Sequence, residues 1–144
     1  MKKFLLIAVG GALVATAVSA AGHLEVISKR QALMGEIRNA SRTLGGMERG
    51  RLDYDAAVVQ STGARIVEIA DEYGTLFIDG SESGGNTKAS PAIWSNRAGF
   101  DAEIMKLKDA GSALASASSE ADFKAAFGEF GATCRSCHSQ YQSR

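Results

Sequence analysis

The stretch that decides the fold is residues 122–141, DFKAAFGEFGATCRSCHSQY, close to the end of the 144-residue chain. Six of its side chains recur at steps of three or four residues, which is the period of one face of an α-helix. They are Phe123, Phe127, Phe130, Cys134, His138 and Tyr141. Ser119, with Asp122 three residues later, resembles the capping pattern of a helix start. The stretch therefore predicts a helix that begins after Ser119 and buries one face.

The same helical period appears in three earlier segments, residues 24–47, 54–73 and 91–117. Gly50 suits the position after the first segment, and Asp53 is a candidate cap for the second. The one long loop predicted is 79–90, DGSESGGNTKAS, and the Ser90-Pro91 pair that ends it is typical of a helix start. No segment of useful length alternates with the period of a strand. The sequence predicts an all-α fold, an antiparallel four-helix bundle.

The first twenty residues, MKKFLLIAVGGALVATAVSA, have the pattern of a secretory signal peptide. Two lysines precede an apolar run, and small residues follow it up to Ala20. We expect residues 1–20 to be cleaved, which leaves residues 21–144 as one exported domain. The destination predicted is the periplasm, and we expect no membrane span in the mature protein.

Composition argues against several classes of protein. The chain has sixteen basic and sixteen acidic residues, and the basic ones are scattered rather than gathered in a stripe. This pattern does not favour nucleic acid as a partner. The sequence shows no convergent set of acid, base and nucleophile, so we do not expect an enzyme.

The chemistry of the chain is concentrated in Cys134, Cys137 and His138. On a helix these three positions share one face, because residues three and four apart are neighbours. The spacing C-x-x-C-H is the attachment signature of a c-type haem. Both thiols can add to haem vinyl groups, and the adjacent imidazole can then ligate the iron. The sequence predicts one covalently bound haem c on the C-terminal helix, with His138 as an iron ligand.

Other uses of the two thiols are open at this point. A C-x-x-C disulfide switch is expected near a strand-to-helix junction, and this chain has no strand pattern. A structural zinc site needs four ligands, and the only further histidine, His23, is distant in sequence. A chance pair of buried thiols is a third alternative. The predicted export signal favours haem attachment over all three.

Four segments together resemble the class II c-type cytochromes, the cytochrome c prime family. They are RQALM (30–34), YDAA (54–57), PAIWS (91–95) and the C-terminal stretch 122–141. The resemblance implies a haem c inside the bundle, with His138 as its proximal ligand. It implies that Arg30 and Gln31 lie beside the haem propionates and that Thr87 and Lys88 approach the haem. It also suggests a homodimer formed through faces of the first two helices.

Met34, four residues after Arg30, decides what the resemblance implies for function. In the low-spin members of the family, of the cytochrome c-556 type, a methionine on the first helix is the sixth iron ligand. This implies an electron-transfer protein with His138 and Met34 as axial ligands and with redox proteins as partners. The alternative is a five-coordinate cytochrome c prime that binds nitric oxide or carbon monoxide, with Met34 only covering the distal face. Met47 lies thirteen residues further on, about 20 Å along a helix, and cannot share the site.

Overall fold

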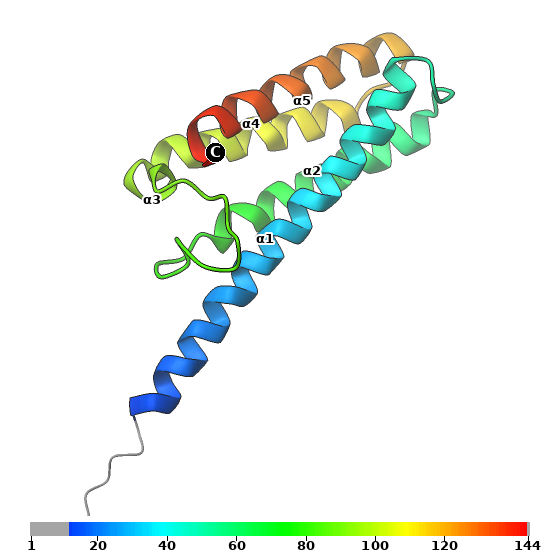
Figure 1. The fold of residues 1–144 in the computed structure, drawn as a ribbon. Helices are drawn as coiled ribbons and strands as arrows, with labels where there is room; N and C mark the ends of the chain where they lie inside the picture. The colour runs from blue at the N-terminus through cyan, green and yellow to red at the C-terminus, as the bar shows by residue number, and fades with distance from the viewer. Residues whose placement is uncertain (1–11, 144) are drawn as a thin grey trace, which may run out of the picture.

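The computed structural model describes the backbone of residues 12–143 and the side chains of residues 21–143 (Figure 1). Its long helices are α1 (Ala12–Glu48), α2 (Ala56–Tyr73), α4 (Arg97–Ala115) and α5 (Glu120–Tyr141). A 3₁₀ turn, η1 (Gly74–Leu76), and the one-turn helix α3 (Ala92–Ser95) lie in the connection between α2 and α4. The long helices run in alternating directions, so the predicted antiparallel four-helix bundle is confirmed.

The predicted signal peptide, residues 1–20, falls on residues whose side chains lie outside the described part of the chain. It stays a prediction. Within the residues that the structure describes, no helix combines the length and the apolar character needed to cross a membrane.

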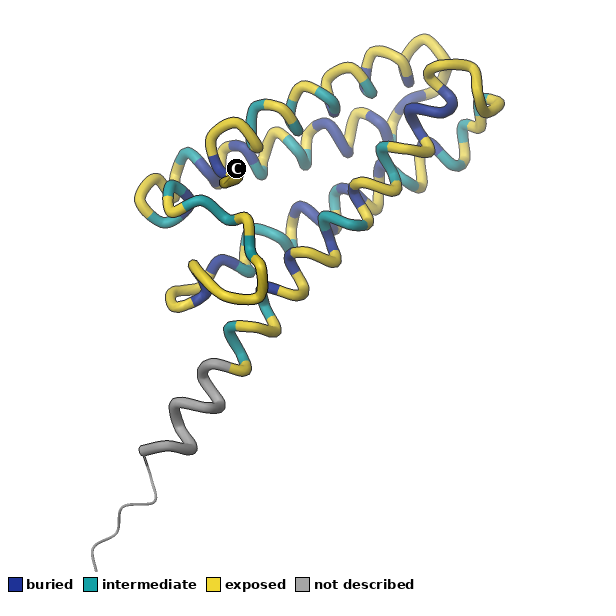
Figure 2. The backbone as a smooth tube through the Cα atoms, viewed as in Figure 1, coloured by how far each residue is buried: buried dark blue, intermediate teal, exposed yellow. Residues whose placement is uncertain are grey.

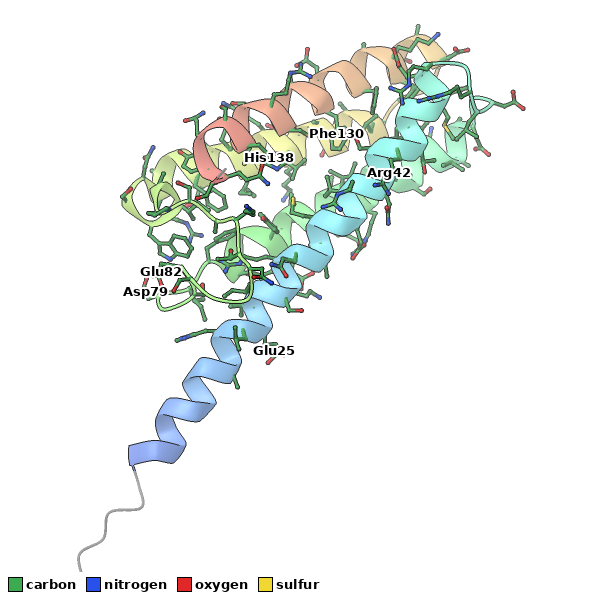
Figure 3. All side chains as sticks on the ribbon, viewed as in Figure 1. Glu25, Arg42, Asp79, Glu82, Phe130 and His138 are labelled. Carbon is green, nitrogen blue, oxygen red and sulfur yellow. The ribbon has the colours of Figure 1, made fainter. Side chains whose placement is uncertain are left out.

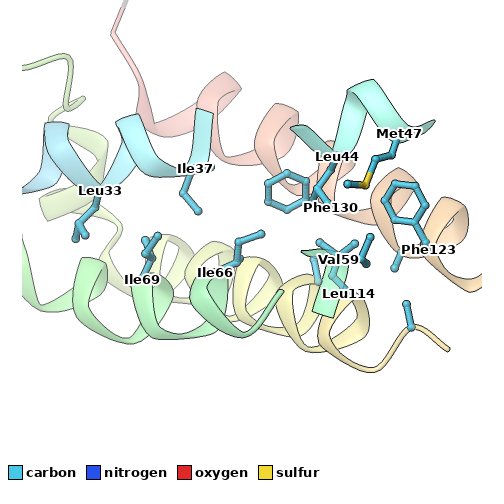
Figure 4. Packing of buried hydrophobic residues seen from close by; sticks show 13 residues of the cluster. Leu33, Ile37, Leu44, Met47, Val59, Ile66, Ile69, Leu114, Phe123 and Phe130 are labelled. Carbon is cyan, nitrogen blue, oxygen red and sulfur yellow. The ribbon is translucent and has the colours of Figure 1, made fainter. Parts of the chain in front are cut away.

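The main hydrophobic cluster runs along the interior of the bundle, from Leu33 on α1 to Phe123 at the start of α5 (Figure 4). Leu44, Val59, Leu114, Phe123 and Phe130 are all 0% exposed there. Burial follows the inward face of each helix, as the tube in Figure 2 shows. Removal of this apolar surface from water is the main force that holds the helices together.

The backbones of helices α2 and α4 are in close contact at Gly63. A Cβ atom at this position would lie only 2.7 Å from the carbonyl oxygen of Gly111. Backbones in such close contact leave no room for a side chain between them. The two helices stay together toward the C-terminal end of α2, where the Lys108 Nζ on α4 lies 2.6 Å from the Asp71 carboxylate on α2. In contrast, α1 and α5 separate toward the end of the bundle where α5 ends (Figure 1).

The predicted third helix, residues 91–117, is wrong as one continuous helix, because Asn96 interrupts it between α3 and α4. Asn96 has φ −131° and ψ 60°, outside the helical region. Its side-chain oxygen accepts a hydrogen bond from the Gly99 N–H at 3.2 Å, and its amide donates to the Tyr141 hydroxyl at 3.1 Å. An asparagine side chain competes in this way with helical backbone hydrogen bonds. The partner Tyr141 is 45 residues away, so a local pattern does not reveal the break.

The cap of α2 is also displaced from its predicted position. Asp55, not Asp53, is the N-cap residue, and its carboxylate accepts a hydrogen bond from the Val58 N–H at 3.0 Å. The predicted start of the first segment at residue 24 is wrong, since α1 begins at Ala12, and Pro91 is the N-cap residue of α3 rather than its first helical residue. Two other predicted boundaries agree with the structure. Gly50 has φ +65° just beyond α1, and the Ser119 hydroxyl accepts from the Asp122 N–H at the start of α5.

Replacing Asp55 by alanine is expected to lower the free energy of unfolding by about 1 kcal/mol, because the Val58 N–H loses its acceptor. Chemical denaturation followed by circular dichroism measures the loss. Asp53→Ala is the matched control, and its effect is expected to stay within about 0.5 kcal/mol. Equal losses in the two variants would contradict the assignment of Asp55 as the cap.

Candidate functional site

A cavity of about 650 Å³ lies between α1 and the pair α4 and α5. This volume is within the usual range for sites that bind small molecules and cofactors. Its wall is largely apolar and includes Ile37, Tyr73, Phe77, Phe100, Leu107 and Phe127. The three phenylalanines on the inward face of α5 therefore have two different roles. Phe123 and Phe130 fill the main cluster, whereas Phe127 lines the cavity.

All three residues of the C-x-x-C-H cluster line this cavity from the last turns of α5. Cys134 and Cys137 are partly buried free thiols, and His138 is exposed (Figure 3). Burial raises the pKa of both thiols, that of Cys137 to about 11. A thiolate is the reactive form of cysteine, so these raised pKa values disfavour a thiol-disulfide switch.

A zinc site is disfavoured by the surroundings of the cluster. Among the described residues, no group of three or more His, Cys, Asp and Glu side chains could hold a metal ion. His23 lies instead beside Gly80 in the loop after α2. The thiols and the imidazole therefore face an apolar cavity rather than further metal ligands.

Met34 lines the same cavity from α1. Its side chain is partly buried and packs against the main hydrophobic cluster. The structure thus brings together Met34 and His138, which are 104 residues apart in the sequence, at one cavity. Met47 is 7% exposed within the main cluster and lies at the far end of α1.

Arg30 is a buried cation in the cavity wall, only 3% exposed. Its Nη2 donates to the Ser81 carbonyl oxygen at 2.7 Å, and its guanidinium lies 4.5 Å from the centre of the Phe77 ring. Burial lowers the pKa of Arg30. Within the described residues no carboxylate forms an ion pair with it. A buried charge is costly unless it is paired, so this position suits an anionic group in the cavity.

Gln31 is exposed and also lines the cavity. Its Nε2 donates to the Gly85 carbonyl oxygen at 2.9 Å. Arg30 and Gln31 therefore both fasten the long loop to α1, a role that the sequence did not reveal.

The same loop is tied to the C-terminal end of α5. Ala89 and Gln142 form an isolated antiparallel bridge. The Ser90 N–H donates to the Tyr141 carbonyl oxygen at 3.0 Å, and the Ser143 N–H donates to the Lys88 carbonyl oxygen at 2.8 Å. Thr87 and Lys88 thereby come to line the cavity. The loop covers one end of the site and holds the last turn of α5 in place.

A model of one protein family, described as Cytochrome C′, matches residues 25–142. The chain belongs to this family. Cytochrome c′ of Rhodopseudomonas palustris is 31% identical over 143 residues, which cover 99% of this chain and 98% of that protein. Cytochrome c-556 of the same organism is 30% identical, over 94% of this chain and 95% of the relative. The solved structure of R. palustris cytochrome c′ is 33% identical and has a TM-score of 0.78, covering 83% of this chain and 96% of that one.

Class II c-type cytochromes of this family contain covalently attached haem c, so the predicted cofactor is confirmed. The residues present fit the group. Two thiols and an imidazole face an apolar cavity, and the unpaired Arg30 in its wall suits an anionic propionate.

The sequence did not single out Glu103, which is a buried carboxylate on α4 in the wall of the cavity. Its helical neighbours are a mixture of polar and apolar residues, so periodicity gives no signal at this position. Its position in the cavity wall is visible only once α4 is packed against α5.

Proposed function

We propose that this protein is a periplasmic electron carrier whose haem c is attached through Cys134 and Cys137 and ligated by His138 and Met34. The observation that supports the proposal most directly is that Met34 and His138 line one cavity from different helices. An iron bound between α1 and α5 would then have an imidazole on one side and a thioether on the other.

Covalent attachment needs no oxidant and no leaving group. Each thiol S–H would add across a vinyl C=C bond, so that the sulfur bonds to one carbon and the hydrogen goes to the other. Cys134 and Cys137 lie one helical turn apart, and two thioethers from one helix would fix the macrocycle against α5. His138, next to Cys137 and lining the same cavity, would then supply the imidazole ligand.

The haem, when bound, supplies reversible one-electron oxidation and reduction. Met34 contributes a soft thioether, which suits haem iron and raises its reduction potential. The apolar side chains of the cavity wall would limit the access of water to the bound group. Arg30 would form a charge-assisted hydrogen bond with a propionate, and Gln31 lies next to it on α1.

Met34→Leu is expected to convert a low-spin protein into a high-spin one, because leucine fills a similar volume but provides no ligand. The wild-type protein should show a low-spin reduced spectrum and a methionine-to-iron charge-transfer band when oxidised. Both features should be lost in the variant, and absorption spectra in the two oxidation states measure this. Met105→Leu is the matched control, since Met105 is 54% exposed on α4.

A high-spin spectrum in the wild-type protein would contradict ligation by Met34. Rapid carbon monoxide binding by the reduced wild-type protein, unchanged in Met34→Leu, would instead support a five-coordinate cytochrome c′ that binds nitric oxide or carbon monoxide. Relatives of both kinds match this chain at nearly the same identity, 31% and 30%. Similarity alone therefore does not choose between the two functions.

The proposal includes a homodimer formed through faces of α1 and α2. One solved cytochrome c′, 26% identical with a TM-score of 0.76, is described as showing ligand-controlled dimer dissociation; the match covers 85% of this chain and 97% of that one. Export to the periplasm through residues 1–20 is part of the same proposal. The redox partners of the protein would be other exported electron-transfer proteins.

A further inference from the structure

Glu103 differs from every other ion-paired acid in the described chain because it is buried. Its side chain is 6% exposed. The other six carboxylates that form ion pairs have side chains between 40% exposed, at Glu72, and 66% exposed, at Glu68. Burial of an ionised group costs free energy unless its hydrogen bonds are satisfied.

The hydrogen bonds of Glu103 are only half satisfied. Its Oε1 accepts from the Lys106 Nζ at 2.7 Å, and the lysine itself is 56% exposed. Its Oε2 is buried and has no hydrogen-bond partner. The bond from Lys106 is the main cause that holds the pKa of Glu103 below its usual value, so the carboxylate is ionised at neutral pH. In a simple surface ion pair, neither carboxylate oxygen would be buried without a hydrogen-bond partner.

The free oxygen belongs to a side chain in the wall of the haem cavity. Glu103 lines this cavity together with Cys137, one of the two proposed attachment residues. The two side chains are close enough for the negative charge to contribute, after burial, to the raised pKa of the Cys137 thiol. Glu103 is thus an anion placed against the segment that binds the haem.

We propose that Glu103 sets the reduction potential of the haem by acting as a fixed negative charge in the wall of its pocket. Reduction adds one electron to the iron and needs no proton from Glu103. A nearby anion stabilises the oxidised form and lowers the potential, and charge and burial around a haem are among the means by which a protein tunes it. The inference rests on the proposed haem attachment at Cys134 and Cys137 and is independent of ligation by Met34.

Glu103→Gln tests the inference in the haem-loaded protein, because glutamine keeps the shape and removes the charge. Potentiometric titration should show a higher midpoint potential, equivalent to roughly a tenfold change in the one-electron equilibrium constant, or 59 mV. Glu103→Asp keeps the charge and should stay close to the wild-type potential. Asp101→Asn is the matched control, since Asp101 is an ion-paired acid of the same helix with a 52% exposed side chain.

The salt dependence of the potential shift distinguishes a buried charge from a charge on the surface. In about 1 M salt the screening length is about 3 Å, so the effect of an exposed carboxylate disappears. The shift in Glu103→Gln should persist there, and any shift in Asp101→Asn should vanish. Glu103→Leu provides a second charge-free variant, should the glutamine variant fail to accumulate. A wild-type potential in both charge-free variants, or a shift that salt abolishes, would overturn the inference.

The same samples keep this inference distinct from the proposed function. A high-spin spectrum would overturn ligation by Met34 and still leave the shift from Glu103 measurable. A mature mass without haem would overturn the attachment, and with it both proposals.

Discussion

A variant in which Cys134 and Cys137 are both replaced by alanine is expected to mature without covalently bound haem. The chain has no other cysteine, so no second thiol can replace them. The apolar cavity of about 650 Å³ would then lose the group that we expect to fill it. Exposure of its apolar wall to water should also lower the thermal stability of the bundle. The intact mass of the purified protein, measured under denaturing conditions, should equal that of the polypeptide alone.

Two further variants make this test specific to the thiols. Ser136→Ala changes the same motif without touching a thiol, and it should retain the full haem mass. Cys134→Ala alone should keep one thioether, through Cys137. Haem that stays attached in the double variant after denaturation would show that the attachment site is elsewhere.

Gly63→Ala is expected to destabilise the bundle by roughly 3 kcal/mol, at the upper end of the usual cost of overpacking. The added methyl group would clash with the backbone nitrogen of Ala115 and would lie 2.7 Å from the Gly111 carbonyl oxygen. These are backbone atoms, so the clash can be relieved only if α2 and α4 move apart. Equilibrium denaturation of the haem-loaded protein measures the loss.

Gly128→Ala is the control for this substitution, because a Cβ at Gly128 on α5 meets nothing within 4 Å. Here alanine only improves helix propensity, and the free energy of unfolding should rise by about 0.5 to 1 kcal/mol. A loss of stability at both positions would show that the close approach of α2 and α4 is not the cause.

The sequence predicted the parts of the molecule that depend on local spacing. The four amphipathic segments follow from steps of three and four residues, and the boundaries at Gly50 and Ser119 agree with the structure. The five residues of the C-x-x-C-H motif lie within one and a half helical turns. The motif alone therefore predicts that Cys134, Cys137 and His138 share one face of the helix. The cofactor followed from the same five residues.

Features that depend on distant contacts were not predictable in this way. The break at Asn96 involves Tyr141, and the burial of Arg30 involves Ser81, which is 51 residues away. The position of the α2 cap was not predictable either, because capping propensity does not distinguish Asp55 from the nearby Asp53. Glu103 gives no signal in the sequence, because an acid followed by a lysine three residues later is usually a solvated surface pair.

The place of Met34 on α1, outside the contacts of α4 with α2 and with α5, has an evolutionary consequence. The close approach of α2 to α4 and the packing of α4 on α5 do not involve Met34, which lies on α1 and is only partly buried. Under the proposed ligation by Met34, a substitution at position 34 would therefore change the coordination of the iron and leave the contacts of α2, α4 and α5 in place. A lineage built on this scaffold can acquire or lose an iron ligand in a single mutational step. Electron carriers and gas-binding proteins can then diverge from one ancestor while their folds stay superimposable.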